Sequence, residues 1–143
     1  EIDSILNYKL QEMKNKNVHL KYSITIPKDL KINVFDLNII LGNLLNNAIE
    51  AIEKAERKYF FINIYFEKNI LFIHIENTYD GNIIKEKETL MTTKEEKQSH
   101  GLGLKSVSSI LEKYDGDIIY DYNDIYFITD VMLCNTSFHH ETE

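Results

Sequence analysis

The chain has 143 residues, of which 43% are hydrophobic and 27% charged, the composition of one globular domain with a sizeable core. Its formal net charge of −7 argues against nucleic acid or an anionic membrane as a general surface partner, although a local phosphate site stays possible. The single Cys134 excludes an internal disulfide framework and a cysteine-based zinc cluster. The sequence has no apolar run near the roughly 20 residues of a membrane span. It also begins without Met or a signal-peptide pattern, so we expect a segment of a longer protein.

The first part of the chain predicts a helix and then a strand. Over residues 3–16, isoleucine, leucine and methionine recur at helical spacing among charged and amide side chains. We therefore expect a short linker helix within residues 1–16. Residues 18–26 alternate apolar and polar side chains, which predicts a strand that Pro27 ends.

A long helix predicted over residues 36–55 is the central element, with Asn33 or Asp36 as its N-cap and a charged tail ending near Lys58. The residues on one side of this helix are apolar and must face the core: Leu37, Leu41, Leu44, Leu45, Ala48 and Ile52. The opposite sector, roughly 60° wide, is polar and carries Asp36, Asn43, Asn47, Glu50 and Lys54.

Three asparagines, Asn43, Asn46 and Asn47, stand within five consecutive residues of this helix. Each costs about 0.5 kcal/mol relative to alanine inside a helix, so their repetition indicates amides directed at a ligand. A solvated face that happens to carry asparagines is the alternative. The hard oxygen of Asn47 suits Mg²⁺, which binds through one or two protein groups together with phosphate oxygens.

Two hairpins are predicted after the long helix. The first has strands over residues 59–67 and 70–77, with a tight turn at Lys68 and Asn69. The second has strands over residues 117–122 and 125–133, with a turn at Asn123 and Asp124. The order of helices and hairpins predicts an α+β fold class. We expect a two-layer α/β sandwich, with a mixed, mainly antiparallel sheet and helices on one face.

The hairpins are separated by a polar loop over residues 78–100, a length typical of functional or disordered segments. A helix follows, ending at Gly116, with these residues expected to face inward: Leu104, Val107, Ser108, Ile110 and Leu111. Its predicted start lies at the pentapeptide HGLGL, which holds Gly101 and Gly103. Glycines let a backbone approach a ligand closely, and a helix start offers free N–H groups, so the pair predicts an anion site. A tight loop-to-helix entry is the alternative.

Several other polar residues are candidates for ligand contacts. Lys94 and Lys97 in the loop could reach a phosphate, as could His100 beside the glycines. Asn77, at a predicted strand end, has the donor and acceptor that suit base recognition, with a turn-forming asparagine as the alternative. His74 is expected to be structural. The sequence contains no P-loop, H-E-x-x-H or G-x-S-x-G motif.

The segments NLLNNAIEA, IENTYDG, TTK and HGLGL, in this order, resemble the ATP-binding catalytic domain of sensor histidine kinases. That domain has the Bergerat ATP-binding fold of the GHKL superfamily, shared with type II topoisomerases and mismatch-repair ATPases. The resemblance extends from Ile2 to Leu133 and is strongest to the peptide-pheromone-sensing, accessory-gene-regulator branch. It implies a catalytic domain over residues 17–134, a linker helix from an upstream dimerisation domain over residues 1–16, and a C-terminal tail over residues 135–143.

The resemblance also implies a role for each matching residue, with ATP and Mg²⁺ as cofactors. Asn47 matches the metal ligand, Asn43 the catalytic position that contacts phosphate or positions water, and Asn77 the residue that binds adenine. Residues from about 79 to 100 correspond to the ATP lid. Gly101 and Gly103 match the second glycine motif, whose amides meet the phosphates. The predicted nucleotide-binding residues also include Lys94, His100, Leu102 and Leu104.

Three features depart from the family pattern. Most relatives have aspartate at the position of Asn77, and many histidine kinases have a phosphate-binding lysine at the position of Glu50. The lid also lacks the phenylalanine-rich segment of longer relatives. The chain carries no phosphoacceptor motif, so the resemblance implies the kinase half without its substrate half.

By this resemblance the domain donates the γ-phosphate of ATP to a histidine on a separate dimerisation domain, and acts on a response regulator indirectly. It would be the cytoplasmic domain of a membrane-anchored quorum-sensing protein, meeting the membrane only through the parent chain and binding no nucleic acid. Two alternatives stay open. One is a non-catalytic nucleotide-binding or interaction module of the same fold, and the other is an anti-sigma-type serine kinase.

Overall fold

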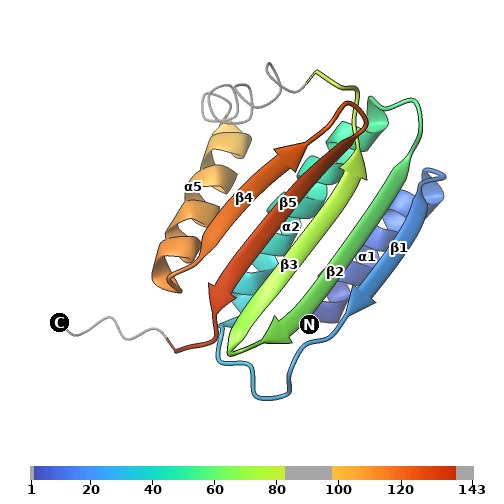
Figure 1. Ribbon diagram of the computed structural model, residues 1–143. Coiled ribbons are helices and arrows are strands. Elements are labelled where there is room, and N and C mark those ends of the chain that lie inside the picture. The colour runs from blue at the N-terminus through green and yellow to red at the C-terminus, as the bar shows by residue number, and fades with distance from the viewer. Residues whose placement is uncertain (1, 83–97, 138–143) are drawn as a thin grey trace.

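The computed structural model describes residues 2–82 and 98–137, with side chains for residues 4–82 and 105–137. Helices α1 (Ile2–Asn15), α2 (Val34–Glu53) and α5 (Gln98–Lys113) form one layer and a five-stranded sheet forms the other (Figure 1). The strands are β1 (His19–Ile24), β2 (Tyr59–Glu67), β3 (Ile70–Thr78), β4 (Asp117–Tyr122) and β5 (Tyr126–Cys134).

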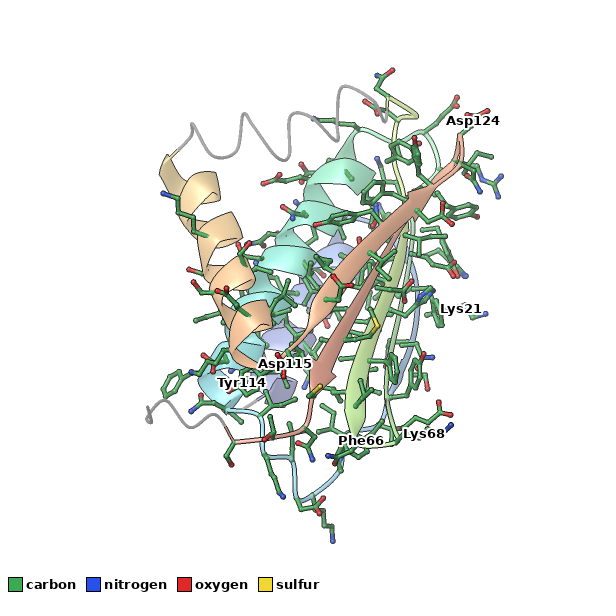
Figure 2. The ribbon with its side chains drawn as sticks, turned by 60° about the vertical axis from the view of Figure 1, so that its left-hand side comes forward. Lys21, Phe66, Lys68, Tyr114, Asp115 and Asp124 are labelled. Carbon is green, nitrogen blue, oxygen red and sulfur yellow. The ribbon has the colours of Figure 1, made fainter. Side chains whose placement is uncertain are left out.

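The sheet has the strand order β1-β2-β3-β5-β4, with β1 parallel to β2 and the other pairs antiparallel. The helices cover one face, and Lys21 lies on the opposite face in the edge-on view of Figure 2. The predicted α+β class and the two-layer sandwich with a mixed sheet are therefore confirmed.

Helix α2 supplies the centre of the core. All six apolar residues predicted to face inward are buried, each with 7% or less of its surface exposed. Asn33 is the N-cap, because its Oδ1 accepts from the backbone N–H of Phe35 at 2.7 Å. The predicted tail to Lys58 is wrong, since the helix ends at Glu53. The Lys58 ammonium instead donates to the carbonyl of Ile52 in the last turn of α2 at 3.0 Å and to that of Ala55, after the helix, at 2.9 Å.

Helix α1 is part of the same core. Leu6, Leu10 and Met13 are buried in one cluster with the apolar residues of α2 and the sheet. The packing follows from their helical spacing, which places all three on one face. The predicted boundary between a linker helix and the domain at residue 17 stays a prediction.

The hairpin turn at Lys68 and Asn69 is confirmed, with φ values of 54° and 66° that fit a type I′ turn. The strand ends differ by small amounts from prediction. Strand β1 is shorter than residues 18–26, β3 extends to Thr78, and β5 begins at Tyr126. In the turn between β4 and β5, Asn123 Oδ1 accepts from the N–H groups of both Ile125 and Tyr126 at 2.8 Å. Ile125 therefore belongs to the turn, and β5 begins one residue later than predicted.

Helix α5 differs from prediction at its start. It begins at Gln98, so Gly101 and Gly103 lie within its first turns and not in a loop before it. A glycine costs only about 1 kcal/mol in a helix, which a continuing helix can absorb. The expectation that Ser108 faces inward is also wrong. Val107, Ile110 and Leu111 form the buried stripe, and Ser108 is exposed because it is rotated roughly 100° from Val107.

Candidate functional site

The described candidate residues belong to α2, β3 and the start of α5. Asp36, in the first turn of α2, accepts hydrogen bonds from Lys113 and Tyr114 at the end of α5, so the two helices run in opposite directions. The start of α5 consequently lies toward the second half of α2. The end of β3 lies at the same end of the domain (Figure 1).

Asn43 and Asn47 lie on the side of α2 that faces α5. They follow Asp36 by seven and eleven residues, which keeps all three on one helical stripe, and both are half-buried. The Asn43 Nδ2 donates to the carbonyl of Ile39 at 2.8 Å, so its amide oxygen is the end that can meet a ligand.

Asn46 has a different environment from its two neighbours. It is exposed, and its Oδ1 accepts from the Lys9 ammonium of α1 at 2.6 Å. A contact between helices therefore accounts for one of the three asparagines. Only Asn43 and Asn47 face the candidate site.

Asn77 lies in β3 on the face covered by the helices. Its residue is only 3% exposed, and it continues the inward series of Ile73 and Ile75. Its Nδ2 donates to the carbonyl of Thr78 at 3.0 Å. The turn-forming alternative is therefore wrong, because a turn asparagine would lie outside the strand and near solvent.

Thr129 is a further buried polar residue near Asn77 that the sequence analysis missed. It is 7% exposed, lies on the inner face of β5 and pairs in register with Ile75, two positions before Asn77. A threonine at an inward position of an otherwise apolar alternating strand was the available signal. Asn77 and Thr129 thus place an amide and a hydroxyl on neighbouring strands beneath the helix layer.

Aromatic rings from β4, from β5 and from the residue after β3 lie beside these two residues. Tyr79 packs edge-to-face on Phe127 with ring centroids 5.9 Å apart, and Tyr120 lies 5.7 Å from the same ring. Burial raises the pKa of Tyr120 above its ordinary value. Tyr79, assigned to the start of the lid, is itself buried, and its hydroxyl donates to the carbonyl of Asn123. The predicted lid segment is therefore anchored to the β4–β5 turn at its first residue.

The remaining predicted contacts are only partly described. Lys94 and Lys97 lie outside the described residues, as do the side chains of the pentapeptide from His100 to Leu104. The backbone of that pentapeptide is helical. Since the first four N–H groups of a helix have no intrahelical partner, those at the start of α5 extend to about Gly101. Gly103 lies beyond them.

Two other kinds of feature are absent from the described residues. Among the side chains of residues 4–82 and 105–137, no group of three or more His, Cys, Asp or Glu could hold a metal ion. Among the helices of the described part of the chain, none has both the length and the apolar character to cross a membrane.

A family model described as the GHKL domain matches residues 32–134, and the chain belongs to this family. Solved histidine kinases share its fold. The nucleotide-free catalytic domain of ThkA superposes with a TM-score of 0.72 and 18% identity, over 94% of this chain and 90% of that chain.

Two other kinases superpose similarly. Acinetobacter baumannii AdeS gives a TM-score of 0.68 and 16% identity, over 94% of this chain and 65% of that chain. Mycobacterial MprB gives a TM-score of 0.63 and 14% identity, over 94% of this chain and 95% of that chain. No curated protein matches the chain.

Proposed function

We propose that this domain binds Mg·ATP and donates the γ-phosphate to a histidine on a separate dimerisation domain, as the catalytic domain of a sensor histidine kinase. One observation carries the proposal. The half-buried Asn43 and Asn47 lie on the side of α2 that faces α5, and the buried Asn77 lies near the end of β3, which is at the end of the domain where α5 begins. Membership of the GHKL family and the fold shared with histidine kinase catalytic domains support it.

Each residue has a role in this proposal that suits its chemistry. Asn77 receives the adenine, Asn43 contacts phosphate or water, and Asn47 offers an oxygen to Mg²⁺. The first N–H groups of α5, with Lys94 and His100, hold the phosphates. When bound, Mg²⁺ neutralises phosphate charge, and its preference for few protein ligands plus phosphate oxygens fits a site with one amide. Catalysis then depends on positioning and charge stabilisation.

The wider context of the domain is proposed from the motif resemblance. The parent protein is a membrane-anchored sensor of the peptide-pheromone-sensing branch, with this domain in the cytoplasm. An upstream dimerisation domain supplies the acceptor histidine, and a response regulator receives the phosphoryl group afterwards.

Substitution of Asn47 tests the nucleotide site. We expect Asn47→Ala and Asn47→Asp to abolish Mg-dependent ATP binding measured by calorimetry, because the amide oxygen that meets the metal is removed or its charge changed. Asn46→Ala is the matched control, since the same residue type one position earlier contacts Lys9 on α1 and not the site. Wild-type affinity in Asn47→Ala would refute the site assignment.

A non-catalytic nucleotide-binding or interaction module of the same fold is the second candidate, favoured by Asn77 and Glu50 at positions where relatives have aspartate and lysine. Radiolabelled ATP and the parent dimerisation domain distinguish the two. Acid-labile label on histidine supports the kinase, and its absence supports the module. Acid-stable label on a partner would indicate a serine kinase instead.

A further inference from the structure

Tyr114 connects the end of α5 to the beginning of α2. The residue is 2% exposed, and its hydroxyl donates to Asp36 Oδ2 at 2.6 Å while accepting from the N–H of Asn33 at 3.0 Å. The Lys113 ammonium donates to the same Asp36 oxygen at 2.8 Å. Figure 2 shows Tyr114 at the lower end of α5, beside the start of α2. We call Tyr114, Lys113, Asp36 and Asn33 the α2–α5 latch.

At neutral pH the Tyr114 hydroxyl is protonated and Asp36 is ionised, which preserves the hydrogen bonds of the latch. Burial and the bond to Asp36 raise the pKa of Tyr114 to about 12, so the hydroxyl remains a donor. Burial alone would raise the pKa of Asp36, but the bonds from Lys113 and Tyr114 outweigh it and lower the pKa. Asp36 is therefore a carboxylate that accepts two strong hydrogen bonds.

The latch end of α5 is also fixed to the sheet. The carbonyl of Tyr114 accepts from the N–H of Cys134 at 3.1 Å, next to the last turn of α5, where the Gly116 N–H donates to Leu111 at 2.6 Å. The other end of α5, at Gln98, lies about 24 Å away at 1.5 Å per residue. Helix α5 is thus held at one end and carries the glycine motif at the other.

We propose that Tyr114 and Asp36 are positioning residues that aim the first turn of α5 at the phosphates beside Asn47. The inference rests on the proposed function. Helix α2 carries both the anchor Asp36 and the site residues Asn43 and Asn47, so the latch fixes the two walls of the site relative to each other. Over that length, a rotation of about 5° at the latch moves the start of α5 by about 2 Å. A misplacement of this size is enough to weaken phosphate contacts.

The variant Tyr114→Phe tests the latch. It keeps the buried ring and the ion pair of Lys113 with Asp36 but leaves the Asn33 N–H without its acceptor. We expect the Kd for Mg·ATP, measured by calorimetry well below Tm, to rise about three- to tenfold, the equivalent of one hydrogen bond. Ile62→Val, on the buried face of β2, is the control. It should lower Tm comparably and leave the Kd unchanged.

Hydrogen exchange without nucleotide is the second readout. Backbone amides from Lys105 to Lys113 should exchange faster in Tyr114→Phe than in the wild type or Ile62→Val, because the hydroxyl that holds the end of α5 to α2 is lost. Wild-type affinity in folded Tyr114→Phe would overturn the positioning role, and so would unchanged exchange. If the wild type itself fails to bind Mg·ATP, the proposed function is refuted, and the latch then has no phosphates to position.

Discussion

At the scale of single residues, His74 links two strands on the face of the sheet opposite the helices. Its Nδ1 meets Asp130 Oδ1 at 2.7 Å and its Nε2 meets Glu76 Oε2 at 2.8 Å. Burial alone would lower the pKa of His74, but the hydrogen bonds to Glu76 and Asp130 outweigh it and raise the pKa. The structural role expected from the sequence fits these contacts.

The raised pKa predicts a pH-dependent contribution of His74 to stability. A folded-state pKa above the unfolded value of 6.5 means that the contribution is fully present below that pH. It is then lost as pH rises through the folded pKa. We expect the wild-type Tm, measured by calorimetry from acidic to alkaline pH, to fall through this window relative to that of His74→Gln. Curves that stay parallel would contradict this prediction.

The polar residues of the candidate site could be predicted only where they are unusual in their local sequence pattern. Asn43 and Asn47 were singled out because asparagine is unfavourable inside a helix, but that repetition also counted Asn46, whose amide contacts α1. Its partner Lys9 is 37 residues away in the chain, and helical spacing cannot indicate such a contact. Thr129 was missed because threonine is ordinary in a strand, and only its inward direction makes it informative.

At the scale of helices and strands, two glycines allow a paired test of how closely the backbone after α5 packs against β5. A Cβ at Gly116 would lie 2.4 Å from the carbonyl oxygen of Met132, whereas a Cβ at Gly42 in α2 would meet nothing within 4 Å. We predict that Gly116→Ala destabilises the domain by about 1–3 kcal/mol, because backbone must move. We expect Gly42→Ala to stabilise it by about 0.5–1 kcal/mol. Urea unfolding of both variants measures this, and equal stabilities would refute the packing argument.

The hairpins were predicted closely because their signals are local. The turn residues Lys68 and Asn69 fix their own register, and β2 and β4 have the predicted bounds. The predicted ends of helices and strands are wrong where a residue outside the helix or strand determines them. The Lys58 ammonium donates to carbonyls at the end of α2, and the Tyr79 hydroxyl donates to the turn after β4. The end of α2 and the chain after β3 therefore could not be predicted from the residues of α2 and β3 themselves.

At the scale of the whole molecule, the layer arrangement followed from the order of elements, but the sheet order did not. Because β1 pairs in parallel with β2, the chain that joins them, which includes α2, crosses over one face of the sheet. Pairing of this kind depends on which apolar faces pack together across the domain. For the same reason, the helical spacing of Leu6, Leu10 and Met13 predicts that they share one face but not that this face packs against α2.

The candidate site joins α2, β3 and the start of α5, so a nucleotide bound there should stabilise the folded domain as a unit. By linkage, Mg·ATP at a free concentration of 100 times its Kd adds about 2.7 kcal/mol to the free energy of unfolding. We predict that the Tm of the wild type, followed by differential scanning calorimetry, rises by several degrees with ATP at constant Mg²⁺. Asn46→Ala should behave as the wild type, and Asn47→Ala should show no rise.

Chelation of Mg²⁺ at fixed ATP should reduce the shift in Tm, because in the proposed site Asn47 meets the nucleotide through the metal. A wild-type Tm that does not respond to ATP would refute both the kinase and a nucleotide-binding module, and would favour an interaction module of the same fold. An equal rise in Asn47→Ala would instead place the nucleotide elsewhere on the domain. The measurement therefore tests nucleotide binding independently of any phosphoacceptor.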